Sequence, residues 1–171
     1  DPVAAARLRV LSRADSMSTV NTTNANRAMS DLKLADGVMQ QIADNITQAQ
    51  TLATQAANGT LSDDQRAAIG QQIANIRQNI ITLANSKDSS GHTLFGGEGT
   101  GDAYTPDASG NPSYAGTASS DEVPLGDGQT VTRSVTGPEF LSFNTGSGST
   151  DLFAVLGNLA SALQGGSSDP A

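Results

Sequence analysis

The sequence contains no cysteine, no tryptophan and a single histidine, and only 4% of its 171 residues are aromatic. Without cysteine the chain can form neither a disulfide framework nor a thiolate centre. A zinc site needs several Cys or His ligands, so one histidine argues strongly against such a site. Of the 36% hydrophobic residues many are alanine, which suits thin seams between helices better than a thick core.

Positive charge is also scarce, since nine Lys and Arg stand against 17 Asp and Glu and give a net charge of −8. Binding to a phosphate backbone needs clustered basic residues, so we expect no nucleic-acid partner. No run of about 18 apolar residues exists, and we expect no membrane partner either. The sequence shows no signal peptide and starts at Asp1 without Met, so we interpret it as an internal portion of a longer protein.

A long stretch from residue 2 to about residue 57 has few helix breakers. Apolar and small residues recur in it at steps of three and four, which predicts a helix with a heptad seam. The seam is mostly apolar from Ala28 to Ala56 but polar between Asp15 and Arg27. Asn58-Gly59 is predicted to end this helix, because glycine readily adopts the left-handed conformation of a helix end.

A second helix is predicted to begin at Ser62, because Ser62 and Gln65 match a capping box. The short loop before it makes the two helices antiparallel neighbours. A first helix of about 55 residues is roughly 80 Å long, and a second of about 25 residues covers less than half of it. Residues before about Leu32 are therefore expected to overhang. The predicted hairpin core consists of Leu32, Ala35, Met39, Ile42, Ile46, Ile69, Ile73, Ile76, Ile80 and Leu83.

From Asp88 to about Thr150 the composition changes to Gly, Ser, Thr, Asp and Pro, with short strand-like runs between turns. A good hairpin turn is Asp127-Gly128, and a last helix is predicted from Asp151 to Gln164. The predicted fold is α+β, with a long helical hairpin over 1–90, a small β-rich domain over 91–150 and a short helix within 151–171. The candidate strands are Thr93–Gly96, Ser113–Gly116, Asp121–Leu125, Thr130–Val135 and Phe140–Phe143.

Several stretches carry a resemblance to a known family. "LANSKDSSGHTLFGG" at Leu83–Gly97 resembles the helix-to-strand junction of bacterial flagellin-type proteins, most of all that of the hook-associated protein 3 group. "DPVAAARL" at Asp1–Leu8 and "LATQAANGTLSDDQRAAI" at Leu52–Ile69 resemble the family's long helix and inter-helix turn. "GNPSYAG" at Gly110–Gly116 and "GPEF" at Gly137–Phe140 resemble its β-rich portion, so the likeness covers nearly the whole chain.

The resemblance implies a structural component of the bacterial flagellum that connects hook to filament and is exported unfolded by a type III apparatus. Its implied partners are flagellin, the adjacent hook-associated junction protein, like subunits in a ring and an export chaperone. Its implied location is outside the cell, and the family's terminal channel-lining helices lie outside this sequence. Two alternatives stay open: flagellin itself, and a secreted glycan-binding module that would use Tyr104 and Tyr114.

The polar seam of the overhang has two interpretations. One is a solvent-exposed, partly frayed helix, and the other is an inter-subunit surface on which polar groups fix the register. The second is favoured because the family assembles through this helix and because a polar helix is poorly stable alone. The predicted interface residues are Asp15, Ser18, Asn21, Thr22, Ala25 and Ala28.

No catalytic, cofactor or metal site is predicted. His92 lies at the helix-to-strand junction, where a solvated or locally bonded histidine is favoured over a catalytic triad. The glycine-rich run at residues 96–101 follows no buried strand, and we interpret it as a linker instead of a nucleotide loop. Four loop acids lack the spacing of a calcium loop, namely Asp102, Asp107, Asp121 and Glu122. We therefore expect a structural protein and not an enzyme.

Overall fold

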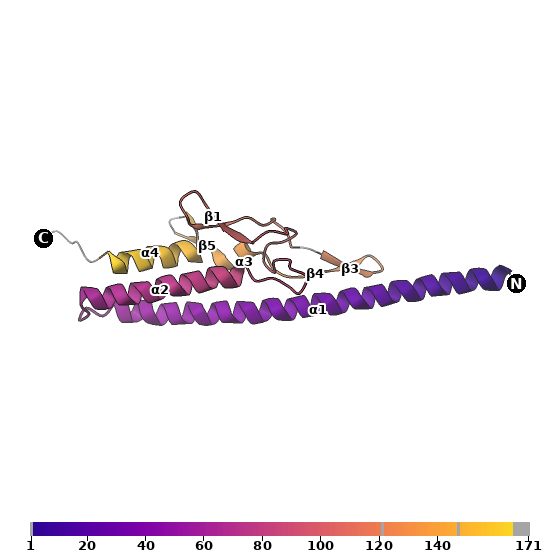
Figure 1. Cartoon of the computed structure of the whole chain (residues 1–171), viewed down its shortest axis with the longest axis horizontal. Helices are drawn as coiled ribbons and strands as arrows, with labels where there is room; N and C mark the ends of the chain where they lie inside the picture. Colours follow the sequence, from indigo (N-terminus) through magenta and orange to yellow (C-terminus); the bar gives the residue numbers. More distant parts are fainter. Residues whose placement is uncertain (1, 121, 147, 166–171) are drawn as a thin grey trace.

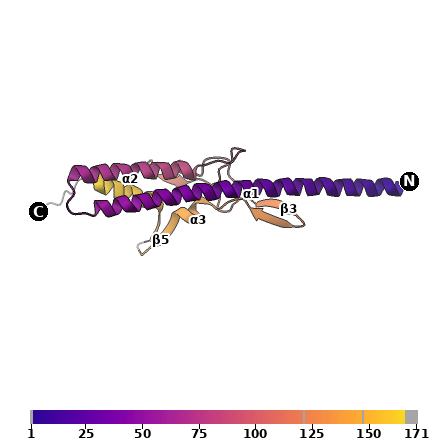
Figure 2. The same cartoon turned by 90° about the horizontal axis from the view of Figure 1, so that it is seen from below.

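One very long helix organises the molecule. In the computed structural model, which describes residues 2–120, 122–146 and 148–165, α1 (Pro2–Ala56) is an unbroken helix of 55 residues. α2 (Asp63–Ala84) and α4 (Leu152–Gln164) lie along the C-terminal half of α1, as Figure 1 shows. The N-terminal half projects beyond them in both views (Figure 2). The structure therefore has a three-helix body and a helical overhang.

The turn between α1 and α2 is closed by side chains. The Ser62 hydroxyl accepts a hydrogen bond from the Gln65 N–H at 3.2 Å, and the Gln65 side chain accepts one from the Ser62 N–H at 2.9 Å. The side-chain oxygen of Asn58 accepts from both the N–H and the hydroxyl of Thr60. The predicted capping box is confirmed, and it satisfies N–H groups that a helix start leaves without backbone partners.

The body is held by a heptad seam on α1. Its buried residues follow a repeat of three and four: Ala28, Asp31, Ala35, Val38, Ile42, Ala49, Leu52 and Ala56. α2 buries Ile69, Ile73, Ile76, Ile80 and Ala84 in the same cluster. Ala35, Ile42 and these four isoleucines were in the predicted hairpin core, and all are buried. Met39, Ile46 and Leu83 are partly buried against the cluster.

Leu32 lies outside this core, contrary to the prediction, and its side chain is 40% exposed. The predicted seam placed Leu32 and Met39 in its second column, whereas the structure turns the preceding residues, Asp31 and Val38, inward. Asp31 takes the inward position because Arg133 binds its carboxylate there. Because a polar residue occupies an inward seam position, the sequence pattern indicates the wrong register for this part of the helix.

The β structure consists of three antiparallel hairpins, each of two strands. Asp127 and Gly128 have φ angles of 52° and 75°, as a two-residue type I′ turn requires, so the predicted hairpin turn is confirmed. Asp121, the first residue of one predicted strand, lies outside the described residues. The hairpins are β1 (Tyr104–Pro106) with β2 (Pro112–Tyr114), β3 (Glu122–Gly126) with β4 (Gln129–Thr132), and β5 (Ser142–Thr145) with β6 (Gly148–Asp151).

Two of the predicted strands are wrong. Thr93–Gly96 forms a single bridge, from Thr93 to Lys87, because its two apolar side chains both turn into the core. Phe140–Phe143 is divided between α3 (Gly137–Leu141) and β5. The Glu139 carboxylate accepts hydrogen bonds from the N–H and the hydroxyl of Thr136, so a capping box starts a short helix there.

α4 closes the core from the C-terminal side. The Asp151 carboxylate caps the helix by accepting from the Ala154 N–H at 2.8 Å. Phe153 is 1% exposed and packs edge-on against Tyr104, with ring centroids 5.0 Å apart. The Arg77 Nε donates to the Phe153 carbonyl at 2.9 Å. The helices and the β1–β2 hairpin share one buried cluster, and the α+β fold is confirmed.

Candidate assembly interface

The overhang of α1 is exposed on every side. Each residue from Pro2 to Val20 is exposed, including Val10 at 69% and Met17 at 60%. Large apolar side chains scattered singly on a surface are common, but here they recur along one helix with no helix beside it in Figures 1 and 2. An exposed helix of this kind is the main candidate for a contact surface.

The exposed apolar residues keep the register of the buried seam. Extending the heptad of Ala28, Asp31 and Ala35 toward the N-terminus reaches Met17, Ala14 and Val10. We call Val10, Ala14 and Met17 the N-terminal stripe. A shallow apolar depression at this end of the helix is lined by Val3, Ala6, Arg7, Val10 and Leu11. A helix placed in line with α2 could therefore pack on the overhang as α2 packs on the body.

A row of hydroxyl groups follows the stripe along the overhang. The hydroxyls of Ser16, Thr19, Thr22 and Thr23 each donate to the backbone carbonyl four residues earlier, at 2.9–3.0 Å. Such bonds satisfy the hydroxyl locally but slightly destabilise and bend a helix. Together with the β-branched threonines, they give this part of α1 a low intrinsic helical stability.

The β3–β4 hairpin lies along α1 between the overhang and the body (Figure 1). The Asn24 amide donates to the Pro124 carbonyl at 3.2 Å. Gly126, with a φ of +99°, sits so close to Asn21 that a Cβ there would come within 2.3 Å of the Asn21 amide nitrogen. The hairpin therefore covers the middle of α1 with the chain's own residues.

The structure corrects one residue of the predicted interface. Ala28 is buried and is not open to another subunit. Asn21 and Ala25 are half-buried and line an open depression beside the hairpin, so they stay predicted interface residues. Asp15, Ser18 and Thr22 are exposed and stay predicted interface residues. The sequence offers no sign that a segment about 100 residues later packs against Asn21 and Asn24.

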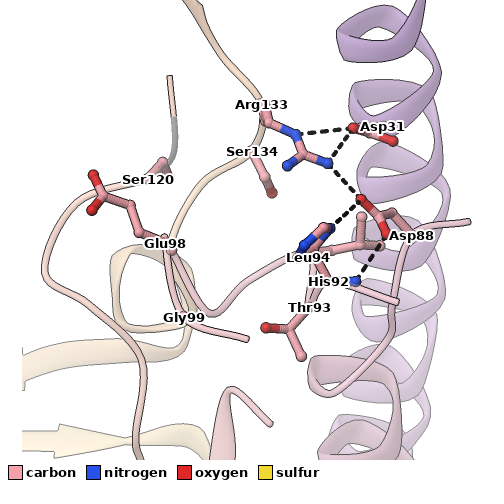
Figure 3. Close-up of a pocket in the computed structure, with 11 residues that line it drawn as sticks. Asp31, Asp88, His92, Thr93, Leu94, Glu98, Gly99, Ser120, Arg133 and Ser134 are labelled. Carbon is pink, nitrogen blue, oxygen red and sulfur yellow. Dashed lines mark hydrogen bonds and ion pairs between the residues drawn. The ribbon is translucent and has the colours of Figure 1, made fainter. Parts of the chain in front are cut away.

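Arg133, which follows β4, connects the β3–β4 hairpin to α1 and to the segment after α2. Its guanidinium lies 2.6 Å from the Asp31 carboxylate on α1 and 2.5 Å from the Asp88 carboxylate after α2. Figure 3 shows Arg133 between these two acids. Asp31 and Asp88 are only 5% and 8% exposed. One partly buried guanidinium therefore pairs with two buried carboxylates, and we call this set the Arg133 clamp.

Asp88 is held in its charged form. Its second oxygen accepts from the backbone N–H groups of Ser90 and His92 at 2.8 and 2.9 Å. Burial favours a raised pKa for Asp88, but these two hydrogen bonds and the Arg133 guanidinium outweigh it and set the pKa below the ordinary 3.8. The exposed His92 imidazole lies 3.6 Å from the Asp88 carboxylate.

Comparison with known proteins places the chain in a family. A family model described as the bacterial flagellin N-terminal helical region matches residues 1–100. The chain belongs to the bacterial flagellin family. The matched residues of this flagellin-family chain include the whole of α1 and α2 and the turn between them.

Individual relatives agree with this assignment. The chain is 32% identical to the flagellar hook-associated protein 3 of Escherichia coli over 96% of its own length, but spans only 54% of that protein. It matches a crystal structure of Xanthomonas campestris FlgL with a TM-score of 0.70 and 30% identity, over 77% of this chain and 42% of that one. A putative flagellar hook-associated protein from Vibrio parahaemolyticus shares the fold, with a TM-score of 0.82 and 21% identity, over 100% of this chain and 73% of that one.

Two features are absent from the described residues of this flagellin-family chain. No described helix is long and apolar enough to cross a bilayer. Residues 2–120, 122–146 and 148–165 contain no group of three or more Asp, Glu or His side chains that could hold a metal ion.

The Arg133 clamp predicts a loss of stability in acid. The pKa of Asp88 is lower in the folded chain than in the unfolded chain, so its contribution is complete above pH 3.8 and lost as the pH falls through the folded value. We expect the free energy of unfolding to fall more between about pH 4 and about pH 2 for wild type than for Asp88→Asn. Urea unfolding of both proteins would measure this, and equal pH slopes would contradict it.

Proposed function

We propose that this chain is part of a structural subunit that connects the flagellar hook to the filament, and that it acts by assembly and not by catalysis. The N-terminal stripe is the observation that carries the proposal, because it continues the core heptad on an exposed helix. Similarity to a flagellar hook-associated protein 3 supports the proposal that this subunit belongs to the flagellum. The proposed partners are flagellin, an adjacent junction protein and like subunits, with an export chaperone before secretion and an extracellular final location.

The mechanism is helix packing from a fixed base. The N-terminal stripe inserts its side chains between those of a neighbouring helix, and burying Val10 and Met17 would contribute about 1.5–3 kcal/mol each. Asp15, Ser18 and Thr22 are exposed on the same stretch of α1 and set the register through polar contacts. The overhang continues the unbroken helix α1 out of the body, and the Arg133 clamp holds the hairpin against α1.

We also propose that three segments of the chain have different roles in the assembly. Residues 1–90 supply the helical wall of the assembly, residues 91–150 the outward β-rich part, and residues 151–171 the return toward the wall. Packing of α4 against α2 supports a role for the last segment in the wall. The three β-hairpins lie on one side of α1 in Figure 1, which suits an outward position.

The N-terminal stripe can be tested by charge insertion. Full-length protein carrying Val10→Asp and Met17→Asp should fold with unchanged melting temperature, because both residues are exposed, but should fail to attach filaments in cells that lack the native protein. Swimming in soft agar and electron microscopy would measure this. Leu8→Asp is the matched control, since Leu8 is 68% exposed on the same helix but lies off the stripe. Normal filaments in the double variant would refute the assembly role of the stripe.

Flagellin is the second candidate, because the matching family model describes a helical region of bacterial flagellins. Immunogold labelling of whole cells separates the two. Label confined to a collar between hook and filament would support the junction role, and label along the whole filament would identify a flagellin. A label on neither would favour the secreted glycan-binding alternative.

A further inference from the structure

The turn between α1 and α2 contains Asn58, the only asparagine in the sequence that is followed by glycine. Both Asn58 and Gly59 are exposed. In contrast to the expectation for this helix end, Gly59 does not have a positive φ. An added Cβ at Gly59 would meet no described atom within 4 Å beyond its chain neighbours. The turn therefore presents a backbone nitrogen that no side chain shields.

Thr60 directs two hydrogen-bond donors at the Asn58 side chain. Its N–H and its hydroxyl donate to the Asn58 Oδ1 at 3.2 Å and 2.9 Å. A bond to the N–H two residues later folds an asparagine side chain back over the peptide between them. In this turn that peptide contains the Gly59 nitrogen, so the side-chain amide of Asn58 is held next to it.

The Gly59 N–H is available for reaction. Among the residues that the structure describes it donates to no acceptor, while the Leu61 N–H donates to the Asn58 carbonyl at 3.3 Å and closes the turn around it. If the Gly59 nitrogen attacks the Asn58 Cγ, negative charge develops on Oδ1. Two donors already directed at that oxygen stabilise such a charge as an oxyanion hole does. One turn therefore holds a nucleophile, an electrophile and the donors that assist their reaction.

We propose that Asn58 is a self-modifying site, which loses its side-chain amide by cyclisation onto the Gly59 nitrogen with assistance from Thr60. The Gly59 nitrogen gives its proton to solvent base and forms a bond to the Asn58 Cγ, and the bond between Cγ and Nδ2 breaks as ammonia leaves. Water then opens the succinimide at one of its two carbonyls. Opening at Cγ gives aspartate, and opening at the main-chain carbonyl gives isoaspartate. The reaction consumes only water.

The modification changes the closed end of the helical hairpin. It places a carboxylate just beyond the C-terminal end of α1, where the helix dipole is already negative, and shortly before Asp63 and Asp64 in the first turn of α2. The isoaspartate form also adds a methylene group to the main chain of the turn. Modified chains should therefore exchange the amide hydrogens of this turn faster than unmodified chains. The inference is independent of the proposed assembly function, because the reaction needs no neighbouring subunit.

Asn85 provides an internal control. It also precedes a small residue, Ser86, but its side chain is bonded through both of its polar atoms. The Asn85 Nδ2 donates to the Tyr104 carbonyl at 2.9 Å, and the Asn85 Oδ1 accepts from the Tyr104 N–H at 2.8 Å. The Ser86 N–H is occupied as well, since it donates to the Leu83 carbonyl at 3.0 Å. We expect Asn85 to keep its amide.

Peptide mapping by mass spectrometry tests the proposal, with aspartate and isoaspartate peptides separated by chromatography. The purified 171-residue chain is held for several weeks in warm, mildly alkaline buffer. Wild type should accumulate both products at Asn58 and neither at Asn85. Gly59→Ala should react about 10- to 100-fold more slowly, because the added methyl group hinders the approach of the nitrogen to Cγ. Thr60→Val should react about 2- to 10-fold more slowly, the effect of losing one hydrogen bond, and Thr60→Ser should react as wild type does.

Both substituted positions are exposed, so the variants should fold as wild type does, and circular dichroism checks this. A wild type that keeps the Asn58 amide would overturn the proposal. Aspartate without isoaspartate would do the same, because direct hydrolysis gives only aspartate. Equal losses at Asn58 and Asn85 would show that the turn does not select the site. A Thr60→Val variant that reacts as fast as wild type would remove the assisting role of Thr60.

Discussion

Replacing Arg133 by methionine is expected to destabilise the protein by about 3–5 kcal/mol, because it leaves two buried carboxylates without their cation. Asp31 and Asp88 both contact the Arg133 guanidinium and are almost fully buried. The free energy of unfolding from urea titrations at pH 7 measures the effect.

An exposed ion pair in the same region provides the control. Lys87 and Asp102 lie 3.0 Å apart, with side chains 45% and 50% exposed, so Lys87→Met should change stability by less than about 1 kcal/mol. Hydrogen exchange adds a local readout, since Arg133→Met should deprotect the β3–β4 amides before those of α2. A loss in Arg133→Met no larger than that in Lys87→Met would show that the clamp does not stabilise the fold.

Replacing Phe153 by alanine is expected to cost about 3–5 kcal/mol, the usual range for removing a buried phenylalanine. Phe153 fills the space between α4 and Tyr104, and its carbonyl is bound by Arg77. Losing the ring leaves a cavity in the buried cluster that α4, α2 and β1 share. Thermal unfolding followed by circular dichroism would record a lower melting temperature.

Two variants with smaller expected losses of stability serve as comparisons. Phe153→Leu keeps most of the buried volume and should cost less than Phe153→Ala. Val155→Ala changes the same helix at a side chain that is 40% exposed and should cost less than about 1 kcal/mol. If Phe153→Ala and Val155→Ala have the same stability, α4 is not anchored by its aromatic residue.

Local signals made the helices predictable from the sequence. The capping box at Ser62 and the N-cap at Asp151 act within three residues of each helix start, and such short-range chemistry can be read directly. One column of the α1 seam, which contains Ala35 and Ile42, was assigned correctly. The other column was missed because Asp31 occupies an inward position that only Arg133 explains.

The remaining features depend on contacts that no local pattern contains. Arg133 meets Asp31 across 102 residues and Asp88 across 45, and the hairpin that covers Asn24 is equally distant in sequence. The β-rich segment was harder to assign because two-stranded hairpins have weak periodicity. One signal was present but misassigned, since Thr136 and Glu139 form the capping box of α3 within a run interpreted as strand.

The row of hydroxyls on the overhang has a consequence for the energetics of assembly. Four side chains between residues 16 and 23 donate hydrogen bonds to the backbone of their own helix. Such a helix has little stability in isolation. We expect a free subunit to exchange the amide hydrogens of this segment quickly and to lose that freedom only when a neighbour binds. Ordering then becomes coupled to binding, which lowers the affinity of any single encounter. Lone subunits would stay dispersed until a growing end offers several contacts at once.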